Sequence, residues 1–267
     1  MAYVSPISDK QHVLLAEQHI KSNYDRAYFL IWRLGIETGY RITDITEIKY
    51  SDIDFSNCQI VISENKGTKA RKARARLKVL EQVKNELIAA NSANPSEMMK
   101  VFITPAKDIY PLVNDIMRPL VDKRINEAME NAPVKTRTAK ISKRTANMLK
   151  ERMEQYRAID DGFVFSRRTL SSNRARNTDG VITRQACWAV FSKLTGFMET
   201  LGQTVKIGCH SLRKIFARHL YHATNKDIGL LMRTIGHSSP EMSLRYIGIT
   251  QDEELSAADS LHTYFDC

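Results

Sequence analysis

The clearest strand signal in the sequence is a short run set among helical patterns. The run Cys58-Gln-Ile-Val-Ile-Ser63 is rich in β-branched residues, which favour extended backbone. A basic turn over 64–69 follows it and could fold the chain back on itself. Apolar residues recur at helical spacing over 24–38, and Gly39 is placed to end that helix. The sequence therefore predicts a mainly α protein with a small antiparallel β-sheet, an α+β fold.

Helical patterns continue on both sides of this strand. A capping-box pattern opens a leading helix within 1–23, while Ser239 and Pro240 supply an N-cap and a first-position proline for a late helix. The other predicted helices span 79–91, 111–130, 142–157, 182–201, 211–223, 227–235 and 252–264. A chain of 267 residues can bury a sizeable core without a metal or a disulfide.

The positive charge of the chain is concentrated in one segment. Lys and Arg exceed Asp and Glu by ten, which favours nucleic acid or an acidic membrane surface as a partner. Seven of the thirteen residues from Lys66 to Lys78 are basic and none is acidic. A solvated charged face is the simpler interpretation, but one sign at this density indicates contact with phosphates. The predicted DNA-binding residues are Lys69, Arg71, Lys72, Arg74, Arg76, Lys135 and Arg137.

The sequence predicts neither a membrane-spanning segment nor an oxidising compartment. The longest apolar stretch, 28–36, is interrupted by Arg33 and is far shorter than the roughly 20 residues that span a bilayer. The N-terminus lacks the basic start and apolar stretch of an export signal. Four cysteines lie far apart without a CxxC pair, which suits reduced thiols. We expect a cytoplasmic protein with no cofactor and no metal.

Six polar side chains stand out by their type and spacing. His210 and Arg213 are three residues apart, on one face of a predicted helix. His237 follows a glycine that can end a helix, and Tyr246 lies nine residues further on. Far upstream, Arg41 precedes by three residues a carboxylate, Asp44, that could fix its guanidinium by a bidentate pair. Taken singly, these would be ordinary partly buried histidines and a core or capping tyrosine.

Together with a lysine in the basic turn, these residue types suit phosphoryl transfer on a nucleic-acid backbone. Arginine forks match the charge that gathers on the non-bridging oxygens of a phosphodiester transition state. A tyrosine can serve as nucleophile, and its phosphodiester keeps the energy of the broken bond for later rejoining. A lysine held against DNA could protonate the leaving 5′-oxygen.

The order and spacing of six motifs resemble the catalytic domain of the tyrosine recombinase (phage integrase) family. The resemblance covers about 24–80 and 160–260, and the ordered set is much more specific than any one motif. The motifs are Thr38-Gly-Tyr-Arg41-Ile-Thr-Asp44, Ser51-Asp-Ile-Asp54, Glu64-Asn-Lys66, His210-Ser-Leu-Arg213, Gly236-His237-Ser-Ser and Leu244-Arg-Tyr246-Ile-Gly-Ile.

The resemblance implies a role for each residue of the set. Tyr246 would be the nucleophile that forms a 3′-phosphotyrosyl link, and Arg41 and Arg213 would clamp the scissile phosphate. His210 would be the acid/base partner and His237 a hydrogen-bond donor to the phosphate. The support of Arg41 would fall to Asp44. The general acid would be Lys66, with Lys69 and Lys135 as alternatives.

The chain also departs from the pattern of the family. We expect no full N-terminal core-binding domain, because only 40 residues precede Arg41 in the sequence, and the distance from Lys66 to His210 is longer than is usual in the family. We therefore expect one catalytic domain over 1–267, with a leading helix at 1–23, a basic helical insertion at 91–160 and a C-terminal helix and tail at 252–267. Our hypothesis is that the insertion takes over part of the DNA clamping.

The resemblance implies a site-specific recombinase that acts on double-stranded DNA as a homotetramer, in a bacterial cytoplasm and encoded by a plasmid or phage. Resolution of plasmid dimers, integration or excision, and inversion all fit. A telomere resolvase, an enzyme like type IB topoisomerase and a catalytically inactive DNA-binding relative are the alternatives. Accessory proteins and the target site cannot be derived from the sequence.

Overall fold

A computed structural model describes residues 6–157, 162–170 and 180–249. The chain forms two compact units: a main unit, made of residues 1–61 and 138–267, and an inserted unit, residues 62–137. The described part is mainly helical with a small three-stranded antiparallel sheet, as the sequence predicts. The predicted tail at 252–267 lies outside the described residues.

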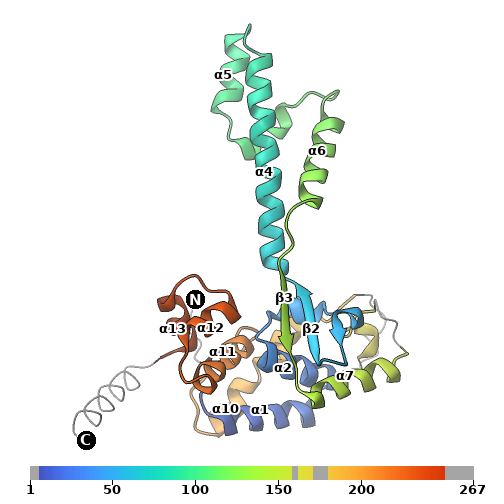
Figure 1. Cartoon of the computed structure of the whole chain (residues 1–267), viewed down its shortest axis with the longest axis vertical. Coiled ribbons are helices and arrows are strands. Elements are labelled where there is room, and N and C mark those ends of the chain that lie inside the picture. Colours follow the sequence, from blue (N-terminus) through green and yellow to red (C-terminus); the bar gives the residue numbers. More distant parts are fainter. Residues whose placement is uncertain (1–5, 158–161, 171–179, 250–267) are drawn as a thin grey trace, which may run out of the picture. The chain divides into compact units, whose positions relative to one another are not determined.

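The main unit is built around α2 (Arg26–Thr38), whose buried side chains include Leu30, Trp32 and Leu34. A Cβ added at Gly35 would lie 2.7 Å from Leu212 Cβ, so α2 and α11 approach each other through this glycine. The other helices of this unit are α1 (Lys10–Asn23), α3 (Ile42–Thr46), α7 (Lys143–Gln155), α9 (Arg184–Phe191), α10 (Leu194–Thr200), α11 (Ser211–Ala223), α12 (Ile228–Ile235) and α13 (Pro240–Ile247) (Figure 1).

Local sequence signals fix several helix ends. Gly39 ends α2 in a left-handed conformation with φ 62°, and Gly236 ends α12 in the same way with φ 69°. The Ser239 side chain accepts a hydrogen bond from Met242 N at 3.2 Å, which caps α13 as predicted. The leading helix begins at Lys10, where Asp9 is the N-cap.

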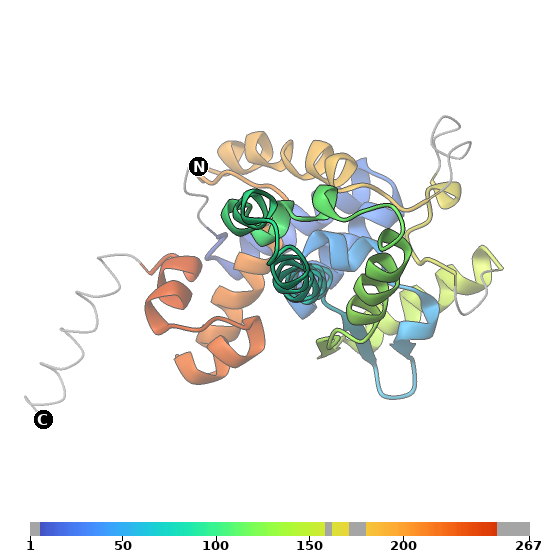
Figure 2. The ribbon, with the colours of Figure 1, turned by 90° about the horizontal axis from the view of Figure 1, so that it is seen from above.

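Three helices near the end of the described chain form a cluster of their own in the main unit (Figure 2). The core of this cluster joins Ala217 of α11, Leu231 and Ile235 of α12, and Ile247 of α13. Burial of these side chains fixes the turn between α12 and α13 against α11. That turn carries His237, and α13 carries Tyr246.

The sheet pairs the predicted strand with a distant one. Its strands are β1 (Ile53–Asp54), β2 (Gln59–Ser63) and β3 (Thr136–Lys140), in the order β1-β2-β3. In the antiparallel pair of β1 and β2, Ile53 lies opposite Ile60.

The predicted basic turn over 64–69 is wrong. One helix, α4 (Asn65–Ala90), begins directly after β2 and runs through the whole basic segment. The run from Lys66 to Lys78 is made mostly of Lys, Arg and Ala, which are strong helix formers. A helix therefore forms here, and Lys66 lies in its first turn.

The inserted unit has its own small core. Its helices α4, α5 (Pro95–Ile103) and α6 (Arg118–Glu130) enclose Val79, Leu80, Val83, Val101, Ile109, Val113, Val121 and Ile125. On its surface, Arg124 forms two hydrogen bonds to Glu86, at 2.8 and 3.0 Å.

The boundaries of this unit differ from those of the insertion expected at 91–160. The unit starts with β2 and ends within β3, so it spans 62–137. Helix α7 belongs to the main unit instead, because Thr145, Ala146 and Leu149 are buried on the face that it presents there. Among the described residues, no helix is both long and apolar enough to span a membrane.

Candidate active site

Arg213 lies at the centre of the candidate site and is almost fully buried, with 5% of its surface exposed. From α11, its Nη1 donates to the carbonyl of Gly39 at 2.5 Å and its Nη2 donates to the carbonyl of Ile235. These carbonyls stand at the C-terminal ends of α2 and α12, where a cation is favoured. The guanidinium therefore joins two helix ends that lie far apart in the sequence.

Arg41 is placed by the tight connection between α2 and α3. It is the N-cap residue of α3 and is partly exposed. Its Nη1 lies 3.9 Å from Oδ2 of Asp44, whose carboxylate is buried. At this distance the ion pair is long, and it places a buried carboxylate beside the guanidinium, as the spacing of the two residues in the sequence suggested.

Tyr246 projects from α13 and is partly buried. Its ring stands edge-on to the imidazole of His237, with centroids 5.0 Å apart and planes at 88°. Nζ of Lys214 lies 5.6 Å from the centroid of the same ring. Burial raises the pKa of Tyr246, while the charge and a hydrogen bond of Arg213, and the charge of Arg41, oppose that rise. Both cations favour the phenolate that a nucleophile requires.

His237 follows directly on the glycine that ends α12. Its Nδ1 lies 3.2 Å from Oγ of Ser243, and that buried hydroxyl donates to the carbonyl of Ser239 at 3.3 Å. Because the hydroxyl hydrogen is used there, the oxygen accepts from Nδ1–H, which leaves Nε2 for another partner. Burial, then the charges of Arg213 and Arg41, lower the pKa of His237.

His210 is the N-cap residue of α11 and keeps contact with solvent. Its pKa is lowered first by the protein atoms packed around it, and then by the positive charges of Arg184, Lys214, Arg213 and Arg41. The neutral imidazole that results can accept a proton at neutral pH.

A cavity of about 490 Å³ opens beside His210, in the main unit. Its lining comes from α9, α10 and the segment 206–211, and includes Arg184, Trp188, Lys206 and Cys209. The Trp188 side chain is exposed.

The structure thus brings Arg41, Arg213, His237 and Tyr246 together. His210 lies close enough for the charges of Arg213 and Arg41 to lower its pKa. The candidate general acids Lys66, Lys69 and Lys135 belong to the inserted unit, where Lys69 and Lys135 are exposed. The choice among them remains a prediction.

The predicted DNA-binding residues differ in their surroundings. Lys69, Arg74 and Arg76 are exposed on α4, whereas Arg71 is partly buried and donates from Nε to the carbonyl of Pro133. Arg137 forms an ion pair with Glu64 at 3.1 Å, and both side chains are largely buried. Glu64 and Arg137 lie near the two ends of the inserted unit, so this ion pair joins the start of the unit to its end.

Two residues that contact Tyr246 or His237, namely Lys214 and Ser243, could not be identified from the sequence. Lys214 follows Arg213 directly, and Ser243 precedes Tyr246 by three residues, so each stands next to a residue that the motifs mark. Neither occupies a motif position, which is why the pattern does not single them out.

Within the described ranges, no group of three or more His, Cys, Asp or Glu side chains could hold a metal ion. Cys58, Cys187 and Cys209 are free thiols, and burial raises the pKa of Cys187 to about 12.

Comparison with known sequences identifies the family. The sequence profile of the phage integrase family matches residues 9–135 and 130–253, which together make up most of the chain. The chain belongs to the phage integrase family of tyrosine recombinases. It is also 50% identical over 52 residues to the "Probable integrase/recombinase YoeC" of Bacillus subtilis (strain 168), a match that covers 20% of this chain and 28% of that protein.

Solved structures share the fold at low identity. The XerA recombinase aligns with a TM-score of 0.54 and 14% identity, over 98% of this chain and 66% of that one. XerH recombinase in a post-cleavage complex with palindromic difH aligns with a TM-score of 0.55 and 14% identity, over 96% and 53%. Tn1549 transposon integrase in complex with circular intermediate DNA gives 0.53 and 14%, over 98% and 68%. The chain thus spans about half to two thirds of these solved relatives.

Proposed function

We propose that this chain is a site-specific DNA recombinase that cuts and rejoins DNA through a 3′-phosphotyrosyl intermediate on Tyr246. The observation that carries the proposal is the surroundings of the Tyr246 hydroxyl. It is hydrogen-bonded to Arg213, and the positive charges of Arg213 and Arg41 lower its pKa against the effect of burial. A phenol that interacts with two arginines is suited to attack a phosphodiester that the same arginines bind.

The chemistry follows from this arrangement. Oη of Tyr246 attacks phosphorus while the bond from phosphorus to the 5′-oxygen breaks, and Arg41 and Arg213 stabilise the charge on the non-bridging oxygens. The neutral imidazole of His210 takes the phenol proton, and a lysine gives a proton to the 5′-oxygen. The reverse steps, with a new 5′-hydroxyl as nucleophile, rejoin the strand. The lysine is Lys66, or else Lys69 or Lys135.

Double-stranded DNA is the proposed substrate, bound in part by the basic first half of α4, which carries the exposed Lys69, Arg74 and Arg76. Relatives support this, since XerH is seen bound to its difH substrate and the Tn1549 integrase to circular intermediate DNA. We propose that the chain acts as a homotetramer, in resolution of plasmid dimers or in integration and excision, in a bacterial cytoplasm.

Covalent capture tests the proposal and finds the target site in the same experiment. Nicked duplexes with a randomised central segment trap the protein on DNA, because the short 5′ fragment diffuses away and rejoining fails. We expect covalent adducts that share one sequence motif, and none from Tyr246→Phe. Adducts without a shared motif, or none from the wild type, would contradict the proposal. Incubation of the recovered site in supercoiled circles then separates strand exchange from hairpin ends, which indicate a telomere resolvase, and from relaxation alone, which indicates a topoisomerase.

A further inference from the structure

The segment 37–41 leads from α2 to Arg41, and contacts from other parts of the main unit hold it. The buried hydroxyl of Tyr40 donates to the carbonyl of Ile60 in β2 at 2.8 Å. The carbonyl of Gly39 accepts from Arg213 at 2.5 Å. The backbone just before Arg41 is therefore tied to β2 on one side and to α11 on the other.

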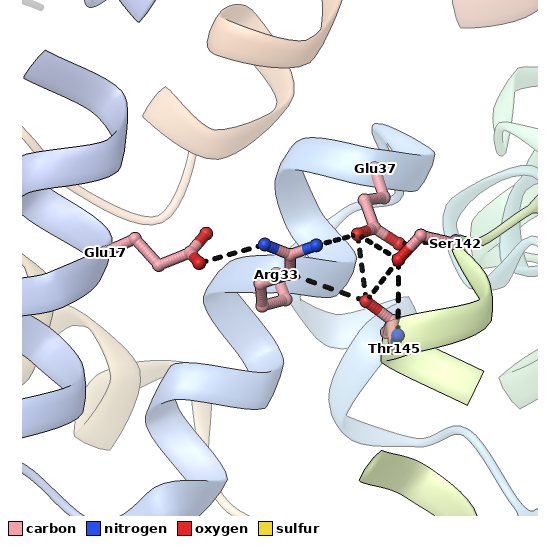
Figure 3. Close-up of polar contacts among 5 residues, drawn as sticks. All are labelled: Glu17, Arg33, Glu37, Ser142 and Thr145. Carbon is pink, nitrogen blue, oxygen red and sulfur yellow. Dashed lines mark hydrogen bonds and ion pairs between the residues drawn. The ribbon is translucent and has the colours of Figure 1, made fainter. Parts of the chain in front are cut away.

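A third tie starts from Glu37, at the C-terminal end of α2 (Figure 3). Its Oε1 accepts from Nη2 of Arg33 at 2.6 Å, from Oγ of Ser142 at 3.0 Å and from Oγ1 of Thr145 at 2.8 Å. Its Oε2 accepts from the backbone N–H of Ser142 at 3.0 Å. Ser142 is the N-cap of α7, so one carboxylate fixes the end of α2 against the start of α7.

Arg33 also pairs with a second carboxylate. Its Nη1 donates to Oε1 of Glu17 on α1 at 2.9 Å. The two glutamates resemble each other in charge, in burial and in their shared arginine partner. They differ in their other hydrogen bonds. The Glu37 carboxylate also accepts from Ser142 and Thr145 at the start of α7, whereas among the described residues the Glu17 carboxylate has a polar partner in Arg33 alone.

We propose that Glu37 is a positioning residue for Arg41. Ile60 comes just before the inserted unit in the chain and Ser142 comes soon after it, so the chain on either side of that unit is hydrogen-bonded to the segment 37–41, which ends in Arg41. Loss of the Glu37 carboxylate would weaken the hydrogen bonds from Ser142 and Thr145 that hold the end of α2 against the start of α7. A small displacement of a guanidinium from the scissile phosphate slows the reaction steeply. This inference rests on the function proposed above.

A double-mutant cycle tests it, with formation of covalent adduct on a nicked duplex of the captured site as the readout. The variants are Glu37→Gln and Arg41→Ala, singly and together, and Glu17→Gln as the matched control. The adduct accumulates over hours on a nicked substrate, so slow rates are measurable. DNA affinity and thermal unfolding are followed for every variant.

We expect Glu37→Gln to slow adduct formation about tenfold or more without a change in DNA affinity. In the Arg41→Ala background the same substitution should add less than about twofold, because no guanidinium is left to position. Glu17→Gln should stay within about twofold of the wild type, although it removes the same kind of ion pair. An equal effect of Glu37→Gln in both backgrounds, or an equal effect of the two glutamates, would overturn the inference. Failure of the wild type itself to form adducts would overturn the proposed function, and this inference with it.

Discussion

The imidazole of His237 stands edge-on to the ring of Tyr246, at 88° and with centroids 5.0 Å apart. The contact links the turn after α12 to the last turn of α13, and the edge-on geometry suits the charge distribution of the tyrosine ring. It also leaves Nε2 of the histidine available, because Nδ1 faces Ser243. A residue that follows a helix-ending glycine is thus fixed beside the proposed nucleophile.

Several histidines make the stability of the protein sensitive to acid. Burial is the first cause that lowers the pKa of His210, His219 and His237. The unfolded chain then binds more protons than the folded chain below the ordinary histidine pKa of about 6.5, so stability is lost as the pH falls through that range. We expect the free energy of unfolding in urea to be lower at pH 5.5 than at pH 7.5.

His219→Gln provides the check on this pH dependence, because His219 lies outside the candidate site and its Nε2 lies 3.2 Å from the carbonyl of Ile7. The variant should lose part of the difference in unfolding free energy between the two pH values. An unchanged difference would show that His219 does not contribute.

Close packing of α2 on α11 predicts a cost for Gly35→Ala. The new methyl group would overlap the Leu212 side chain, and overpacking of this kind costs about 1–3 kcal/mol of unfolding free energy. The control is Gly196→Ala in α10, where nothing lies within 4 Å of the added Cβ. There the substitution should stabilise the protein by about 0.5–1 kcal/mol, since alanine is the better helix former. Chemical denaturation of both variants measures the difference, and equal effects would refute the role of this packing.

The basic first half of α4 should dominate the salt dependence of DNA binding. We expect a variant with Lys69, Arg74 and Arg76 changed to Gln to bind more weakly at 100 mM salt. Each lost phosphate contact should lower the slope of log affinity against log salt by about 0.9, for a total of about 2–3. A control variant changes the exposed Lys100, Lys107 and Lys123 of the same unit to Gln. The same loss of slope in both variants would show that the net charge of the protein sets the salt dependence, and not the location of the charges on α4.

Local signals in the sequence predicted the parts of the fold that depend on local chemistry. Gly39 and Ser239 mark helix ends by their own conformational and hydrogen-bonding properties, and both stand where expected. The basic turn failed because the pairing of β2 with β3 joins residues more than seventy positions apart. No local pattern encodes such a contact, while the alanines and lysines between the strands favour a helix.

In the candidate site, too, the sequence predicted what local motifs mark and missed the contacts between distant residues. The ordered motifs identified residues that the structure brings together, including Arg41 and Tyr246. They could not reveal the tie between Glu37 and Ser142, because a hydrogen bond between residues 105 positions apart leaves no periodic trace. A polar residue such as Glu37, which positions another residue and does not touch the substrate, is identified from the contacts and the burial of its side chain in the structure.

The central claim is that Tyr246 forms the covalent bond to DNA. Adduct from the wild type on a nicked duplex of the captured site is digested with protease and nuclease, and the modified peptide is sequenced by mass spectrometry. We predict one phosphate-linked nucleotide on Tyr246, attached through its 3′-oxygen, and no adduct from Tyr246→Phe. A nucleotide on another residue, or an adduct that persists in Tyr246→Phe, would contradict the account.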